Sequence, residues 1–250
     1  MSPVLETREL TVRFGGHVAV DRVSCAFRAG VTAIVGPNGA GKTTYFNLIS
    51  GQLAASAGRV RLFGEDITRL SAPQRTKRGI GRAFQLTNLF PRLSVLENVR
   101  LAVQARADMG KSLLSTWRSH VELLEKAAFF LERVALADKR DTPAAALPHG
   151  DQRKLEVAIL LALEPEVFMF DEPTAGMSVD EVPTVLQLIE DIRRKGDKTI
   201  LLVEHKMDVV RSLADRIIVL HQGELVADGA PAEVIASPIV QEAYLGISRG

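Results

Sequence analysis

The sequence is poor in cysteine and in long apolar runs. Cys25 is the single cysteine among 250 residues, so an internal disulfide framework is excluded. The longest apolar runs, residues 157–163 and 167–170, fall well short of the ~20 residues that a membrane-spanning helix needs. No basic segment followed by an apolar stretch opens the chain. We therefore expect a protein of a reducing, cytoplasmic setting that does not cross a membrane by itself.

The chain also has no large excess of charge of either sign, because its formal net charge is only +1. The distribution is uneven, however: residues 59–118 carry twelve Lys or Arg against four Asp or Glu, whereas residues 156–191 carry nine Asp or Glu and no Lys or Arg. Basic composition alone is a weak indicator of nucleic-acid binding. We expect a solvated surface or a docking face for a protein partner there, and no nucleic-acid partner. The remaining composition, 46% hydrophobic and 24% charged, is that of an ordinary globular protein.

The most informative motif is a glycine-rich loop that follows the β-branched run 31–35 and precedes a helical pattern. It has the spacing G-x-x-x-x-G-K-[ST], and this strand-loop-helix context is the one that identifies a phosphate-binding loop. Its glycines allow backbone N–H groups to converge on an anion at the start of a helix. Lys42 is expected to reach the β- and γ-phosphates, and the Thr43 hydroxyl to ligate Mg²⁺. The loop comprises Gly36, Pro37, Asn38, Gly39, Ala40, Gly41, Lys42, Thr43 and Thr44.

Two further strand-like runs end in polar side chains. Asp171 and Glu172 follow the apolar run 167–170, and His205 follows the run 199–203. Ligands of open α/β sheets gather at the carboxyl ends of strands, so these side chains are predicted to lie beside the phosphates. Asp171 is suited to Mg²⁺ and Glu172 to polarising the attacking water. The alternatives are exposed strand-end acids and a packing histidine.

Gln85 and Phe14 carry weaker signals. Gln85 follows a strand that begins at Ile80, where its amide could ligate Mg²⁺ or hold the attacking water, although a lone Gln at a strand end is usually a surface residue. Phe14 lies where the first strand meets a Gly-Gly turn. An aromatic ring there could stack on adenine, or it could belong to the core, and the sequence leaves both open.

The order of elements predicts an α/β fold with a helical insertion. Strand patterns over residues 4–14, 19–27 and 31–35 precede the first long helix. From about residue 86 to 148 the pattern is helical, with Ser94 predicted to cap a helix over residues 95–107 and a second amphipathic helix over residues 117–134.

With these motifs in this order, nearly the whole chain resembles the ATPase subunits of ABC transporters. The resemblance implies a P-loop NTPase (RecA-like) core with N-terminal antiparallel strands and an inserted helical subdomain. It divides one domain, 1–250, into a nucleotide-binding core (1–86 and 155–230), a helical subdomain (87–154) and a helical tail (231–250). By the same resemblance, residues 36–44 match the Walker A loop, Gln85 the Q-loop glutamine, Asp171 the Walker B aspartate, Glu172 the catalytic glutamate, residues 175–178 the D-loop, His205 the switch histidine and Phe14 the adenine-stacking aromatic.

Within that family, residues 14–16, 85–91 and 223–229 look most like the ATPases of branched-chain amino acid importers. The resemblance implies ATP and Mg²⁺ as cofactors, a second ABC ATPase subunit, identical or different, and membrane permease subunits as partners. A periplasmic or extracellular binding protein would be an indirect partner, and the chain would sit at the cytoplasmic face of the membrane. The alternative is a soluble ABC-type ATPase that remodels a ribosome or DNA complex, which the single cassette without sustained heptads does not favour.

One motif departs from the family pattern. The signature, usually Leu-Ser-Gly-Gly-Gln, here reads Leu147-Pro148-His149-Gly150-Asp151-Gln152. Pro148 removes a hydroxyl and an N–H that contact the nucleotide of the opposite subunit in the family. Either His149 supplies a replacement donor beside the Gly150 N–H, or this half of the paired site is weak and hydrolysis depends on a partner ATPase. Asp151 is expected to place a negative charge near the polyanion.

Overall fold

The computed structural model describes residues 3–83, 89–107, 121–238 and 240–241. Among these residues, no helix is both long enough and apolar enough to cross a membrane. The chain divides into two compact units: unit 1 is Met1–Ile80, Glu166–Glu172 and Ile192–Gly250, and unit 2 is Gly81–Pro165 and Pro173–Asp191.

Unit 1 contains an antiparallel sheet with the strand order β2-β1-β4-β5. Its first two strands form a hairpin through the turn at Gly15 and Gly16, and Phe14 and His17 are register partners across that turn. Buried and more exposed residues alternate over the second half of β2, as expected for a strand with one buried face, whereas β1 interrupts the alternation with three consecutive buried residues. The strands are β1 (Leu5–Phe14), β2 (His17–Phe27), β4 (Ala57–Leu62) and β5 (Glu65–Asp66).

The second sheet has the strand order β10-β9-β3-β8-β7-β6. Its centre is parallel, and the strands β3, β7 and β8 are almost continuously apolar because helices and a second sheet cover them. β9 and β10 form an antiparallel pair at one edge. The strands are β3 (Gly30–Val35), β6 (Ile80–Ala83), β7 (Val167–Asp171), β8 (Thr199–Val203), β9 (Arg216–His221) and β10 (Glu224–Gly229).

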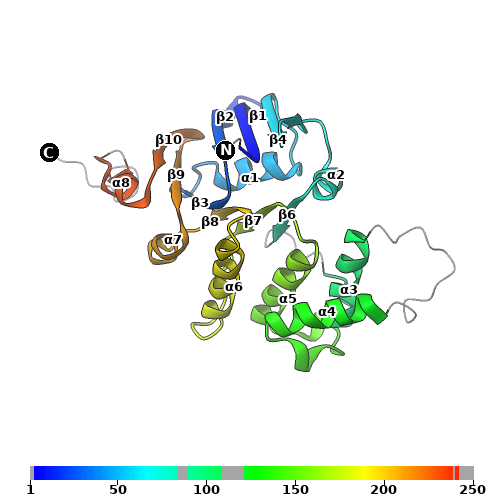
Figure 1. Cartoon of the computed structure of the whole chain (residues 1–250). Helices are drawn as coiled ribbons and strands as arrows, with labels where there is room; N and C mark the ends of the chain where they lie inside the picture. The colour runs from blue at the N-terminus through cyan, green and yellow to red at the C-terminus, as the bar shows by residue number, and fades with distance from the viewer. Residues whose placement is uncertain (1–2, 84–88, 108–120, 239, 242–250) are drawn as a thin grey trace. The chain divides into compact units, whose positions relative to one another are not determined.

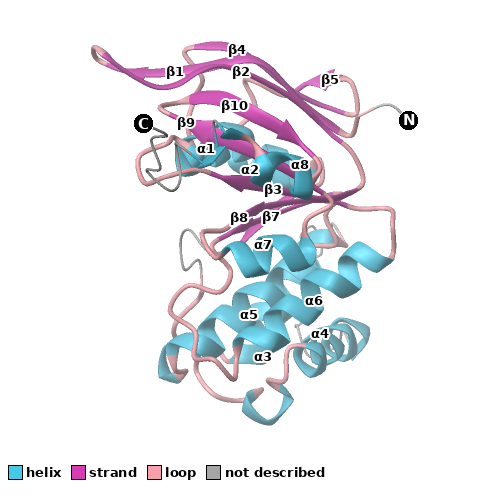
Figure 2. Cartoon of the chain, turned by 90° about the vertical axis from the view of Figure 1, so that its left-hand side faces the viewer, coloured by secondary structure: helices cyan, strands magenta, loops and turns pink. Residues whose placement is uncertain are grey.

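Helix α1 (Lys42–Ser50) lies between the two sheets of unit 1, as Figures 1 and 2 show. Its Tyr45, Phe46 and Ile49 side chains are fully buried in a core that includes residues of both sheets. The smaller helices α2 (Ala72–Lys77), α7 (Met207–Leu213) and α8 (Pro231–Ala236) complete the unit. Ser71 caps α2 in a capping box with Gln74.

Arg75 of α2 closes the end of α1. Arg75 is 2% exposed, and its guanidinium donates to the Leu48 O (2.6 Å) and the Ile49 O (2.7 Å), which are carbonyls at the end of α1. It also donates to the Leu70 O and the Thr68 O. Burial lowers the pKa of Arg75 to about 10. The helix that begins in the phosphate loop is therefore fixed at its far end by one buried cation.

Unit 2 is helical. Its helices α3, α4 and α5 pack on one another, and Ser94 caps α3 through the Glu97 N–H (3.2 Å), which confirms the predicted cap. The predicted second helix is described only from Val121, because residues 108–120 lie outside the described residues. The domain boundaries remain a prediction. The helices are α3 (Val95–Arg106), α4 (Val121–Arg133), α5 (His149–Ala162) and most of α6 (Val182–Arg194), with 3-10 turns Ala137–Lys139 and Ala144–Ala146.

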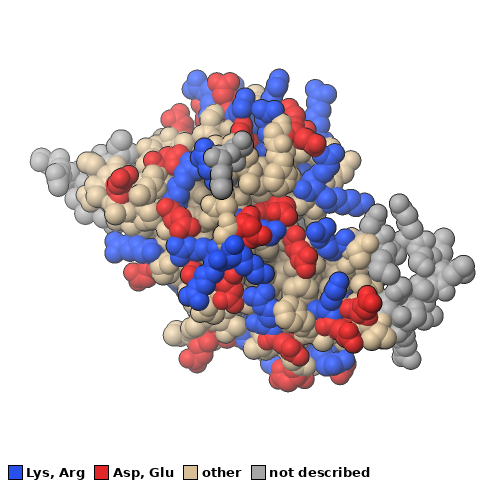
Figure 3. Space-filling view, in the orientation of Figure 1, with Lys and Arg blue, Asp and Glu red and all other residues tan. Residues whose placement is uncertain are grey.

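Lys and Arg alternate with Asp and Glu over the face drawn in Figure 3. Within the basic segment, Arg100 pairs with Glu97 (3.0 Å) and Arg59 with Asp66 (3.9 Å). Some of the basic charge predicted from composition is therefore balanced locally.

Candidate functional site

The site in unit 1 forms at the edge where three neighbouring strands end. β3 pairs with β8, which pairs with β7, and the register places Ile34 opposite Val203 and Val203 opposite Asp171. The phosphate loop follows β3, Glu172 follows β7 and His205 follows β8. Since parallel strands bring their carboxyl ends to one edge, this register alone brings the three segments together.

The phosphate loop depends on glycine at two positions. Gly36 has φ +155°, and a Cβ there would lie 2.1 Å from the Leu220 O. Gly41 has φ +94°, and a Cβ there would lie 2.5 Å from the Ala19 O. Both contacts are impossible for any other residue without a backbone shift. The loop is therefore held against β9 and β2 by close backbone approaches that only glycine permits.

Lys42 is oriented by the loop itself. Its Nζ donates to the Gly36 O (2.6 Å) and to the Pro37 O (2.9 Å), and the side chain is 6% exposed. Burial lowers the pKa of Lys42, while the charges of Glu172 and Asp171 oppose that shift. Asp171 is 7% exposed. An ammonium group thus lies at the loop with two carboxylates close enough to favour its charged form.

Glu172 and His205 form a pair. The His205 Nε2 and the Glu172 Oε1 are 2.7 Å apart, and about two fifths of each side chain is exposed. Glu172 has φ +52°, a left-handed conformation that is rare for glutamate, and its N–H donates to the Val203 O (2.9 Å). His205 is exposed, which contradicts the alternative of a packing histidine. Of the two carboxylates, Asp171 is buried, so the alternative of an exposed strand-end acid is wrong for that residue.

Glu204 is a member of the site that the sequence analysis missed. Its carboxylate is 3% exposed and accepts the N–H of His205 (3.0 Å) and, at longer range, that of Lys206 (3.3 Å). The carboxylate thereby fixes the turn that carries His205. A charged residue directly after the apolar run of β8 is the signal that could have identified it.

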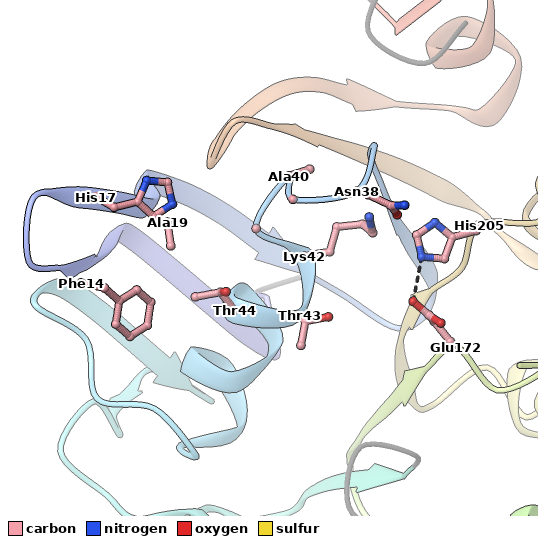
Figure 4. Close-up of a pocket in the computed structure, with 12 residues that line it drawn as sticks. Phe14, His17, Ala19, Asn38, Ala40, Lys42, Thr43, Thr44, Glu172 and His205 are labelled. Carbon is pink, nitrogen blue, oxygen red and sulfur yellow. Dashed lines mark hydrogen bonds and ion pairs between the residues drawn. The ribbon is translucent and has the colours of Figure 1, made fainter.

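A cavity of about 430 Å³ extends along the loop. Figure 4 shows Glu172 and His205 at one end of it, Lys42 and Thr43 in the middle, and Phe14 and His17 at the other end. Phe14 is 52% exposed, so the alternative that it belongs to the core is wrong. His17 and Ala19 were missed, although the two-glycine turn places His17 opposite Phe14. The lining residues are Phe14, His17, Ala19, Asn38, Gly39, Ala40, Gly41, Lys42, Thr43, Thr44, Glu172 and His205.

The altered signature lies in unit 2, at the start of α5. His149 is exposed and is the first helical residue, and Pro148 before it gives no side-chain cap. Gly150 is buried, and a Cβ there would lie 2.0 Å from the Glu181 Oε1, so a larger residue would displace the Glu181 carboxylate. The first N–H groups of α5 are thus left without a side-chain cap from its N-cap residue, which is the arrangement that attracts anions.

Asp151 is placed differently from the expectation. It is 5% exposed and pairs with Lys139 and with Lys154 (3.0 Å). Burial by itself would raise the pKa of Asp151, but its bonds to the two lysines hold that pKa below the usual value. Two lysines therefore compensate the negative charge that Asp151 was expected to place near the polyanion. Gln85 lies outside the described residues.

The phosphate loop after β3, the consecutive carboxylates at the end of β7 and the histidine after β8 define a P-loop ATPase of the ATP-binding cassette class. A sequence model described as "ABC transporter" matches residues 20–175, and the chain belongs to that family. It is an ATP-binding cassette whose ATP hydrolysis is coupled to transport. A second model, "Branched-chain amino acid ATP-binding cassette transporter", matches residues 224–248.

Curated relatives cover nearly all of the chain. The high-affinity branched-chain amino acid transport ATP-binding protein LivG of Salmonella typhimurium is 38% identical, with 98% of each chain covered. The corresponding protein BraF of Pseudomonas aeruginosa is also 38% identical, with 98% of each chain covered. These relatives are transport proteins, and they do not support the soluble alternative.

Solved structures agree with this family. A nucleotide-free ATP-binding cassette from an ABC transporter superimposes with a TM-score of 0.83 at 30% identity, covering 100% of both chains. A dimeric post-hydrolysis cassette bound to ADP and Pi gives a TM-score of 0.78 at 25% identity, covering 91% of this chain and 98% of the other. The α/β fold predicted from the sequence is confirmed.

Proposed function

We propose that this chain is the ATP-hydrolysing subunit of an importer for branched-chain or related amino acids. The match of residues 224–248 to a branched-chain amino acid cassette model supports the substrate class, as do the names of the relatives. No residue of the chain recognises the amino acid in this proposal, because the transport path belongs to permease subunits.

The phosphate loop fits a nucleotide triphosphate bound with Mg²⁺. Lys42, Thr43 and Thr44, the first residues of α1, line the cavity. The Thr43 hydroxyl and the Asp171 carboxylate are oxygen ligands of the kind that Mg²⁺ prefers. Lys42 would hold the β- and γ-phosphates, and Phe14 would stack on adenine at the far end of the cavity. Mg²⁺ supplies charge neutralisation at the phosphates when it is bound. Gln85 remains a predicted ligand.

The pair of Glu172 and His205 is the observation that carries the hydrolytic role. A carboxylate accepts a proton from the attacking water, and a histidine 2.7 Å away orients that carboxylate. The carboxylate is reached from the cavity that would hold the γ-phosphate. His205 is placed by the turn that Glu204 fixes, and its ring would turn from Glu172 to the γ-phosphate when nucleotide is bound.

A second cassette subunit, identical or different, is the proposed partner at the nucleotide. Each phosphate loop would meet the start of α5 of the other subunit, where His149 and the N–H of Gly150 would contact the γ-phosphate. A solved relative is dimeric with ADP and Pi. The altered signature is thus compatible with an active half-site, since His149 provides a donor where the serine is missing.

Unit 2 also offers a surface for a permease. Phe90 and Leu93 are 55% and 36% exposed on a turn that Asn98 holds: its Oδ1 accepts the Phe90 N–H (2.8 Å), and its Nδ2 donates to the Phe90 O (3.1 Å). Exposed apolar side chains on a fixed turn are suited to a protein partner. We place the chain at the cytoplasmic face of the membrane through this contact.

Substitution Glu172→Gln tests the proposed function. The amide cannot accept the water proton, so we expect steady-state ATP hydrolysis to fall by about 100-fold or more. ATP affinity, measured by equilibrium binding, should stay within about twofold because Glu172 binds no part of the ground-state nucleotide. Surviving turnover would contradict the general-base role. Co-purification with permease subunits, followed by leucine uptake into proteoliposomes, tests the transport role separately.

A further inference from the structure

A charge cluster in unit 2 joins the start of α5 to the segment before α6. Asp151, in the first turn of α5, pairs with Lys139 of the preceding 3-10 turn and with Lys154 one turn further along α5 (3.0 Å). Asp151 is 5% exposed. A carboxylate this deeply buried is stable only when it is paired, so the two lysines are required for its charged form.

The cluster extends beyond α5 through Lys154. Its Nζ also lies 3.8 Å from the Glu181 Oε1. The other Glu181 oxygen, Oε2, accepts the Ser178 N–H (3.0 Å) and the Ser178 hydroxyl (2.9 Å). One continuous chain of contacts therefore runs from Lys139 through Asp151, Lys154 and Glu181 to Ser178.

Gly150 is where this chain of contacts meets the signature. The Glu181 carboxylate lies so close to Gly150 that an added Cβ would be 2.0 Å from one oxygen and 2.3 Å from the other. The ammonium group of Lys154 attracts the Glu181 carboxylate toward α5 and so favours its position beside Gly150. The position of Glu181 and the backbone of Gly150 are thus set together.

We propose that Asp151 and Lys154 are positioning residues that fix the first turn of α5 against the segment Ser178 to Glu181, and thereby preset His149 and Gly150 for the nucleotide of a second subunit. This inference rests on the proposed function, in which a partner's γ-phosphate meets α5. Two acids and two lysines give the cluster no net charge. The start of α5 therefore keeps its partial positive charge for an anion, although an aspartate stands in the signature.

The experiment compares Asp151→Asn, Lys154→Met and their double variant with wild type. Each variant leaves the phosphate loop intact, so nucleotide affinity of the isolated subunit, measured by equilibrium binding, should change by less than about twofold. Turnover at saturating ATP should fall by about tenfold, because misplaced positioning groups act on kcat. The double variant should lose clearly less than the two single losses combined, since both substitutions remove the contact between Asp151 and Lys154. Lys154→Arg, which keeps the charge, should restore most of the turnover.

Asp191→Asn is the matched control, because Asp191 pairs with Arg133 (3.4 Å) in the same unit but lies outside the cluster. Variants are compared only if their thermal midpoints show that they fold, and Asp151→Glu replaces Asp151→Asn if the latter does not. Turnover of the cluster variants equal to that of Asp191→Asn would overturn the inference, as would additive losses in the double variant. Wild-type protein that neither hydrolyses ATP nor associates on binding it, both alone and with a second cassette subunit added, would instead overturn the proposed function.

Discussion

At the scale of single residues, the hydrolytic site combines a strained backbone with a paired side chain. Glu172 adopts φ +52° directly after a buried strand, and such a conformation costs on the order of 1 kcal/mol or more. Its N–H bond to the Val203 O and its contact with His205 offset that cost. The strain directs the carboxylate out of the line of β7 and into the cavity that contains the phosphate loop.

Phe14 gives a test of the far end of the cavity. We expect Phe14→Ala to weaken ATP binding by about tenfold, since stacking of an aromatic ring on a base contributes about 1–3 kcal/mol. Phe14→Trp should keep wild-type affinity, because stacking uses only the flat face of the ring. Equilibrium titration with ATP and with inorganic triphosphate checks this. If Phe14→Ala weakened binding of triphosphate as much as binding of ATP, the substitution would act on phosphate binding by the loop and not on stacking with adenine.

The single thiol provides a second residue-scale test. Burial raises the pKa of Cys25 to about 11, although its hydrogen bond with Tyr45 opposes the shift. The thiolate is the reactive form, so we expect labelling by a disulfide reagent at pH 8 to be at least about 100-fold slower in native protein than in urea. Label incorporation followed by mass spectrometry measures both rates. Equal rates would show that Cys25 is accessible in the native state.

At the scale of elements, α1 depends on both of its ends. The phosphate loop fixes its start, and Arg75 satisfies the carbonyls of Leu48 and Ile49 at its end. Replacing Arg75 by Met would leave these buried acceptors unpaired, at about 1–3 kcal/mol for each.

We therefore expect Arg75→Met to lower the free energy of unfolding by about 2–4 kcal/mol in urea titrations. Arg69→Met, at an exposed position, should change it by less than about 0.5 kcal/mol. A loss for Arg75→Met no larger than that of the control would show that solvent satisfies these carbonyls.

The start of α5 predicts a pH dependence. The folded state holds the pKa of Asp151 below its ordinary value of 3.8, so Asp151 stabilises the fold above that value, and the contribution is lost as pH falls through the folded pKa. The difference in unfolding free energy between wild type and Asp151→Asn should be constant from about pH 7 to pH 5 and shrink below about pH 4. A difference that grows on acidification would contradict the pairing with Lys139 and Lys154.

The sequence predicts the elements well, and the reasons are physical. The loop from Gly36 to Thr44 is recognisable because phosphate binding requires these residue types at this spacing. Asp171, Glu172 and His205 are recognisable because each stands just after an apolar run that predicts a buried strand. Contacts between distant segments were not predictable in this way. The partners of Asp151 lie on a separate 3-10 turn and one helical turn away, and lysines at such positions are usually solvated. The exposure of Phe14 required the hairpin register, which the sequence left open.

At the scale of the whole molecule, the chain carries two different parts of a nucleotide-binding site. The cavity with Phe14, Lys42 and Glu172 belongs to unit 1, whereas His149 and Gly150 belong to unit 2. Each unit has its own helices or sheets and its own buried charges. If two subunits combine as proposed, each nucleotide would be held by unit 1 of one subunit and unit 2 of the other.

This division predicts how the whole molecule associates. With Glu172→Gln to prevent hydrolysis, ATP should convert the protein from monomer to dimer, whereas ADP should not, since only the γ-phosphate would reach α5 of the second subunit. Light scattering coupled to size-exclusion chromatography measures both masses. If a different cassette is the natural partner, the dimer should appear only when that subunit is added. Dimers formed equally with ADP would contradict the role of the γ-phosphate.

Lys42 shows how the loop is prepared before nucleotide arrives. Its ammonium group already donates to the Gly36 O and the Pro37 O. When a triphosphate binds, phosphate oxygens would replace these carbonyls as the acceptors. The rotamer entropy of a buried lysine, up to about 2 kcal/mol, is then lost during folding and not during binding. Nucleotide affinity and the stability of the empty loop are therefore linked through one side chain, and a substitution such as Lys42→Met would alter both at once.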